Sequence, residues 1–93
     1  MKTVKSLELG EIVFSTAGRD SGRFYIVVEI IDENYVSIAD GDLRRIESPK
    51  KKKIKHLKTE GIIIEKIKEK IELEKKIFDA EIKSALRSFN GSI

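Results

Sequence analysis

The 93-residue sequence contains no cysteine, no tryptophan, one proline and one histidine. Without cysteine the chain can form neither disulfides nor thiolate metal sites, and a single histidine cannot assemble a metal cluster. No stretch approaches the roughly 18 apolar residues that span a bilayer, and the first residues lack an apolar run of signal-peptide length. We therefore expect a cytoplasmic protein without membrane partner, cofactor or metal, with residues 1–93 forming one small domain.

The net positive charge of the chain is small, but its basic residues are unevenly distributed. The net charge is +3. Residues 1–40 carry four basic and seven acidic side chains, residues 41–58 carry eight and two, and residues 59–93 carry seven of each. Because salt confines the field of a charge to about 8 Å, a local patch can attract a polyanion even on a nearly neutral chain. Lysine-rich loops are also common on protein surfaces that bind nothing, so the charge distribution alone does not decide whether the partner is a nucleic acid.

Short apolar stretches between turn residues predict five strands, at residues 11–15, 24–31, 35–39, 43–46 and 54–58. Residues 24–31 are apolar on both faces, which predicts that residues 25, 27 and 31 need cover from outside the sheet. Asp40 and Gly41 form the strongest hairpin signal. Five short strands at this spacing favour a small SH3-like or OB-like barrel.

From residue 59 the apolar period becomes helical. The stripe consists of Ile64, Ile67, Ile71, Phe78, Ile82, Ala85, Leu86 and Phe89. We expect two helices at about 64–74 and 79–90, capped by Asp79 and stopped at Asn90 and Gly91, although one continuous helix also fits. The barrel at residues 10–58 or a second copy of the chain would cover the stripe, and we favour a tail, residues 59–93, packed on the barrel.

The segment from Gly10 to Ile31 resembles a KOW module, the short motif of several ribosomal proteins and NusG-type transcription factors. The matching residues are Gly10, the run 12–14, Gly18, Arg19, Gly22, Arg23 and the run 25–31, with a departure at Phe24. The continuation DENYVSIADGDLRRIESPKKKKIKHLK is similar to the module of large-subunit ribosomal protein fourteen of the eukaryotic and archaeal type. Stand-alone bacterial relatives of that group share this length and a helical tail. The resemblance implies an SH3-like five-stranded barrel that presents its glycine loop to RNA.

The candidate RNA-binding residues lie in two segments. The glycine loop, residues 16–23, offers Arg19 and Arg23, with Gly18 and Gly22 setting its shape. The basic segment, residues 44–58, offers Arg44, Arg45, Lys50, Lys51, Lys52, Lys53, Lys55, His56 and Lys58. Alternative roles remain open for several of these: Arg23 could pair with Asp20, Arg44 or Arg45 with Asp42 or Glu47, and His56 could simply be packed.

Three functions compete at this stage. The favoured one is a non-catalytic, ribosome-associated module that docks on structured RNA, with ribosomal RNA the expected partner and a monomer expected away from the ribosome. The second is an adaptor in transcription or translation that binds ribosomal or transcription proteins through the barrel and tail. An enzyme is the least favoured, because the sequence shows no catalytic constellation or phosphate-binding loop.

Overall fold

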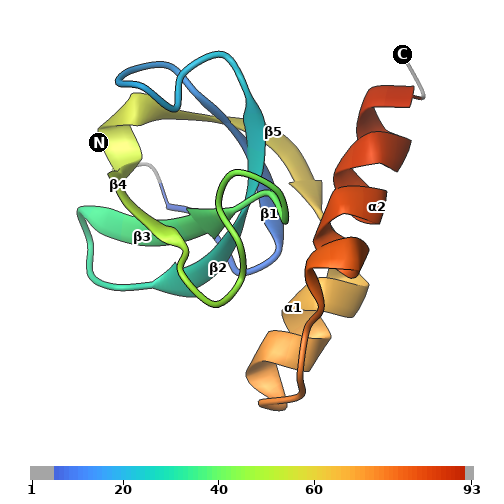
Figure 1. Ribbon diagram of the computed structural model, residues 1–93. Coiled ribbons are helices and arrows are strands. Elements are labelled where there is room, and N and C mark those ends of the chain that lie inside the picture. Colours follow the sequence, from blue (N-terminus) through green and yellow to red (C-terminus); the bar gives the residue numbers. More distant parts are fainter. Residues whose placement is uncertain (1–5, 92–93) are drawn as a thin grey trace.

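The computed structural model describes residues 6–91, in which a five-stranded antiparallel sheet carries two helices on one face (Figure 1). The elements are β1 (Glu11–Ser15), β2 (Phe24–Ile30), β3 (Tyr35–Ala39), β4 (Lys50–Lys53), the 3₁₀ turn η1 (Ile54–His56), β5 (Leu57–Ile63), α1 (Glu65–Glu72) and α2 (Asp79–Gly91). The strand order is β4-β3-β2-β1-β5. A mainly β fold with a helical C-terminal segment is therefore confirmed, and the tail forms two helices.

The sheet differs from the expected closed barrel. Its edge strands β4 and β5 pair only with β3 and β1, respectively, within the described residues. The short η1 turn joins these two edges along the chain without hydrogen-bonding one strand to the other. The sheet thus stays open, and the SH3-like barrel is not confirmed.

The strand predicted at residues 43–46 is wrong. The Asp40 carboxylate accepts the backbone N–H groups of Asp42 and Arg44 at 2.9 and 2.8 Å, which folds the chain into a compact turn. The Arg44 carbonyl also accepts the N–H groups of Asp40 and Gly41. Because an aspartate can satisfy nearby backbone donors in this way, Asp40–Gly41 opens a longer loop and not a two-residue hairpin. The lysine run forms the next strand, and residues 54–58 are divided between η1 and the start of β5.

Strand β2 contributes to two hydrophobic clusters, one on each face. Tyr25 and Val27 belong to the first, with Leu7, Val13, Val36, Ile38, Ile54 and Leu57. Ile26 and Val28 belong to the second, with Ile12, Ala39, Ile67, Ile77, Ile82 and Leu86. The helices thus cover the face that bears residues 26 and 28, opposite to the face expected, and Ile31 is 40% exposed.

Two details of the helical segment correct the sequence reading. Phe78 is 55% exposed, and Ile77 takes the buried place, because residues 75–78 between the helices are not helical and do not continue the helical period. Asp79 does not cap α2: its Oδ1 accepts the Ile46 N–H at 2.7 Å. Glu81 instead accepts the Phe78 N–H at 3.0 Å and pairs with Lys70 of α1 at 2.5 Å. Neither helix has the length and apolarity needed to cross a bilayer.

Candidate nucleic-acid interface

The lysine run forms an edge strand whose side chains alternate in direction. Lys51 and Lys53 of β4 are exposed, Lys50 is half-buried and Lys52 is buried. The Nζ of Lys51 lies 4.6 Å from the centre of the Tyr35 ring on β3, a cation–π contact. Exposed lysines on an edge strand also discourage pairing with another chain, so these charges have a structural use besides any role in binding.

Lys52 points into the protein. Its side chain is 8% exposed, and its Nζ donates to the Ala17 carbonyl at 2.6 Å and lies 3.8 Å from the Asp20 carboxylate. A buried ammonium needs such partners because desolvation of an unpaired charge is costly. Lys52 therefore holds the glycine loop against β4, while its neighbours in the run face solvent.

The remaining cations of the run follow through η1 and into β5. Lys55 and Lys58 are exposed, and His56 is half-buried. The His56 carbonyl accepts both the N–H and the hydroxyl of Thr16, each at 2.9 Å, which ties the glycine loop to this turn. No metal-binding cluster exists within residues 6–91. We refer to residues 50–58 as the lysine segment.

The glycine loop is held in a defined shape. Gly18 and Gly22 have φ angles of +84° and +83°, a region that other L residues rarely adopt. A Cβ on Gly22 would meet no atom within 4 Å, so its surroundings are open, whereas one on Gly18 would lie 3.0 Å from Lys52 Nζ. Arg19, at the loop tip, is exposed.

Two buried aspartates tie the loops together. Asp20 of the glycine loop accepts from Arg44 Nε and Nη2 at 3.3 and 3.1 Å, and Asp40 accepts from Arg23 Nη2 at 3.4 Å. These partners replace the pairings considered from the sequence, Arg23 with Asp20 and Arg44 with Asp42 or Glu47. Burial and the two nearby carboxylates raise the pKa of Tyr25, whose hydroxyl donates to the Asp20 carbonyl.

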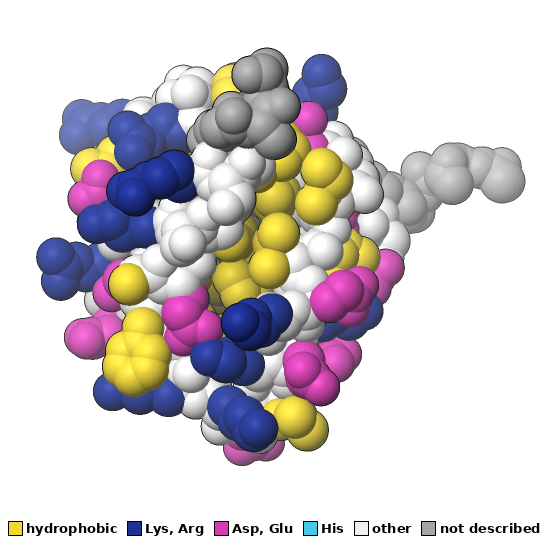
Figure 2. All heavy atoms as spheres, turned by 90° about the vertical axis from the view of Figure 1, so that its right-hand side faces the viewer, with side chains coloured by type: hydrophobic (Ala, Val, Ile, Leu, Met, Phe, Trp, Pro, Cys, Tyr) yellow, Lys and Arg dark blue, Asp and Glu magenta, His cyan; other side chains and the backbone are white. Residues whose placement is uncertain are grey.

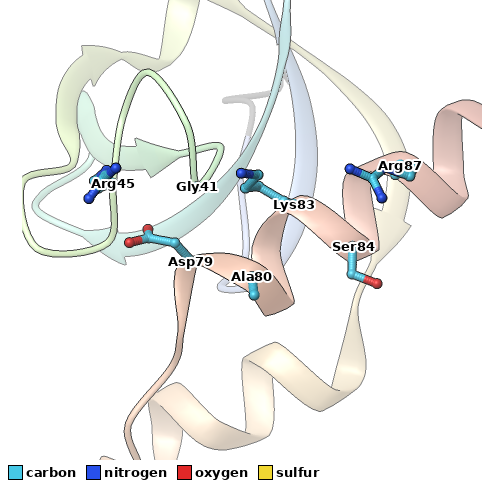
Figure 3. A pocket seen from close by; sticks show the side chains of 7 residues that line it. All are labelled: Gly41, Arg45, Asp79, Ala80, Lys83, Ser84 and Arg87. Atoms are coloured by element: carbon cyan, nitrogen blue, oxygen red, sulfur yellow. The ribbon is translucent and has the colours of Figure 1, made fainter.

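A second group of cations was missed by the sequence reading. Lys83 and Arg87 of α2 point toward the loop that carries Gly41 and Arg45, whereas Ser84 points away (Figure 3). The available signal was their i, i+4 spacing, which places two positive side chains on one side of α2.

No family model matches this chain. It is 31% identical to large ribosomal subunit protein eL14 of Methanococcus vannielii over 81 residues, which are 87% of this chain and 90% of the relative. It is 34% identical to eL14 of Pyrobaculum calidifontis over 85 residues, or 91% and 76% of the two chains. The eL14 protein of Methanococcus maripaludis is 32% identical over 81 residues. Matches of this length extend beyond the strands into the helical segment.

Proposed function

The chain belongs to the eL14 family of large ribosomal subunit proteins, and from that premise we propose that it is a non-catalytic, RNA-binding component of the large ribosomal subunit. The observation that carries the proposal is identity above 30% over most of both chains. A ribosomal location would make the protein cytoplasmic and its main ligand ribosomal RNA.

We further propose that the glycine loop and the basic segment form the RNA contact. The direct contacts would come from the exposed cations that form no salt bridge within residues 6–91, which are Arg19, Arg45, Lys51, Lys53, Lys55 and Lys58, with half-buried Lys50 and His56 beside them. Cations on phosphates release condensed counterions, so this contact would be strong in low salt and largely indifferent to base sequence. Arg23, Arg44 and Lys52 would act mainly by fixing the loops through Asp40 and Asp20.

The finer assignment to a stand-alone bacterial relative with a KOW module remains part of this proposal. The KOW part is supported by the residues quoted from the segment 10–58 and by the positive φ angles of Gly18 and Gly22. The adaptor alternative is not favoured. The helical stripe that it would offer to a partner is largely used within the protein, because Ile67, Ile82 and Leu86 are buried in the cluster under the helices.

The first test is to identify the RNA and the particle. Tagged protein crosslinked in cells should recover large-subunit ribosomal RNA and should sediment with the large subunit in a sucrose gradient. Recovery of proteins without RNA, or exclusion from the subunit fraction, would contradict the proposal.

The second test concerns the lysine segment. The variant Lys51→Gln/Lys53→Gln/Lys55→Gln should lower the slope of log affinity against log salt by about 2 to 3 units, since each phosphate contact contributes about 0.7 to 0.9. Fragments tiling the large-subunit ribosomal RNA are the probe. The matched control, Lys66→Gln/Lys75→Gln/Lys76→Gln, removes the same charge from exposed positions in the helical segment. Equal slopes for the two variants would remove the lysine segment from the interface.

A further inference from the structure

A second positively charged surface lies where the loop after β3 meets helix α2. A shallow groove of about 320 Å³ is lined by Gly41 and Arg45 from the loop and by Asp79, Lys83, Ser84 and Arg87 from α2 (Figure 3). We call it the seam groove. An adjoining hollow of about 430 Å³ shares Lys83 and Arg87 and reaches Arg23 and Gly22 of the glycine loop.

The walls of the seam groove are fixed by close packing of backbone on backbone. Gly41 has a φ angle of +79°, and a Cβ there would overlap the Asp79 carbonyl oxygen and lie 2.7 Å from Lys83 Cγ. On the same seam, the Asp79 carboxylate holds the Ile46 N–H at 2.7 Å. The loop therefore cannot move away from α2 without losing both contacts, and the two walls that carry the cations are held together before any ligand binds.

The cations that line the groove and the adjoining hollow are all exposed, whereas Asp79 is half-buried and Asp40 is buried. Arg45, Lys83 and Arg87 are exposed, and within residues 6–91 none of them forms a salt bridge. Asp79 lies one helical turn before Lys83, but its Oδ1 is engaged by the Ile46 N–H. Asp40, which lines the hollow, is buried and accepts from Arg23. Only Asp42 adds an exposed carboxylate, so positive charge predominates at the opening.

Two like charges four residues apart on a helix disfavour each other, as Lys83 and Arg87 do here. An anion bound between these two side chains would relieve that repulsion. Figure 2 shows a stripe of hydrophobic side chains in the middle of the helical face, with Lys and Arg side chains and some Asp and Glu side chains at its left edge.

We propose that the seam groove is a second RNA contact, which binds phosphates of the RNA backbone through Arg45, Lys83 and Arg87. The guanidinium groups can grip a phosphate through two parallel hydrogen bonds, while Lys83 supplies a point charge. This inference rests on the proposed function, because it assumes an RNA ligand. It adds helix α2 to the interface, so that the helical segment contributes contacts of its own besides covering the sheet.

The test uses the full chain and the ribosomal RNA fragment that binds the parent most tightly. The variant Lys83→Gln/Arg87→Gln should lower the salt slope by about 1.4 to 1.8 units. The control Lys66→Gln/Lys75→Gln removes two exposed lysines from the same helical segment outside the groove and should leave the slope unchanged. Circular dichroism melting checks that both variants fold.

A second measurement needs no substitution. Lysine-specific labelling of the parent, read by mass spectrometry, should show Lys83 protected by the RNA fragment and Lys75 not protected. Unchanged labelling of Lys83, or equal slopes for the two variants while the lysine-segment variant still loses affinity, would overturn the seam groove alone. Absence of RNA binding by the parent would overturn the groove and the proposed function together.

Discussion

The lysine segment and the seam groove are two positively charged surfaces built in opposite ways. The lysine segment has six lysines within nine consecutive positions, and strand alternation turns one of them, Lys52, inward. The seam groove draws Arg45, Lys83 and Arg87 from a loop and a helix that are distant in sequence. The lysine run thus suggests more solvent-facing cations than the lysine segment has, and no run in the sequence indicates the seam groove. The number of cations in a run is a poor guide to the number that face a ligand.

The largest expected loss of stability comes from removing side chains that pack α2 against the sheet. Ile82→Ala with Leu86→Ala removes two buried side chains, each worth about 2 to 5 kcal/mol. On a small domain of about 5 to 15 kcal/mol total stability, this should abolish cooperative unfolding near room temperature. Both surfaces should be lost together, because β2 contributes to both hydrophobic clusters.

The control for that experiment is Leu73→Ala with Phe78→Ala, at positions that are 57% and 55% exposed. It should stay within about 0.5 kcal/mol of the parent for each site in urea denaturation. Parent-like unfolding of Ile82→Ala/Leu86→Ala would mean that the helices are dispensable, and the seam groove would not be a fixed surface.

The next effect distinguishes two glycines with the same backbone conformation. Gly41 and Gly22 have φ angles of +79° and +83°, but only a side chain at Gly41 would collide with α2. Gly22→Ala should cost about 1 to 2 kcal/mol for the left-handed conformation alone. Gly41→Ala should cost a further 1 to 3 kcal/mol or so for overpacking at the seam. Equal losses of unfolding free energy for Gly22→Ala and Gly41→Ala, measured by chemical denaturation, would show that α2 and the loop can move apart to accept the extra methyl group.

A smaller effect separates neighbours within the lysine run. Lys52→Met leaves the Ala17 carbonyl without its ammonium partner and should cost about 1 to 3 kcal/mol, without changing the salt slope of RNA binding. Lys51→Met should cost no more than about 0.5 kcal/mol and should lower the slope by about 0.7 to 0.9 units. The reverse pattern, with stability lost at Lys51 and the slope changed at Lys52, would contradict the assignment of the two side chains.

The smallest effect is a pH dependence of the link between the helices. The hydrogen bond from Lys70 and that from the Phe78 N–H lower the pKa of Glu81. A carboxyl whose pKa is lowered by folding stabilises the protein above its unfolded value, about 4.3, and this contribution disappears as pH falls through the folded value.

The denaturation midpoints of the parent and Glu81→Gln should therefore differ near pH 7 and converge in acid. Glu47→Gln serves as the control, because Glu47 is exposed and forms no salt bridge within residues 6–91. A difference for Glu81→Gln that persists unchanged below pH 3 would show that the ion pair is not its source.

Much of the fold follows from local patterns. The strands at residues 11–15, 24–31 and 35–39 and both helices were predicted within about two residues, because apolar periodicity and turn residues act over short distances. The prediction failed after Ala39, where Asp40 closes a turn with its own carboxylate, and at Phe78, which the stripe includes but the non-helical link exposes.

The sequence by itself determined the absence of thiol chemistry, the local concentration of positive charge and the periods that make β2 a strand and α2 a helix. Only the tertiary structure decided which face of β2 meets the helices, which lysine of the run points inward, and which arginine pairs with which aspartate. The physical reason is the range of the interactions. The side-chain periods of strands and helices are set by residues close together in the sequence. A buried ion pair or a groove depends instead on which distant segments the two hydrophobic clusters bring together.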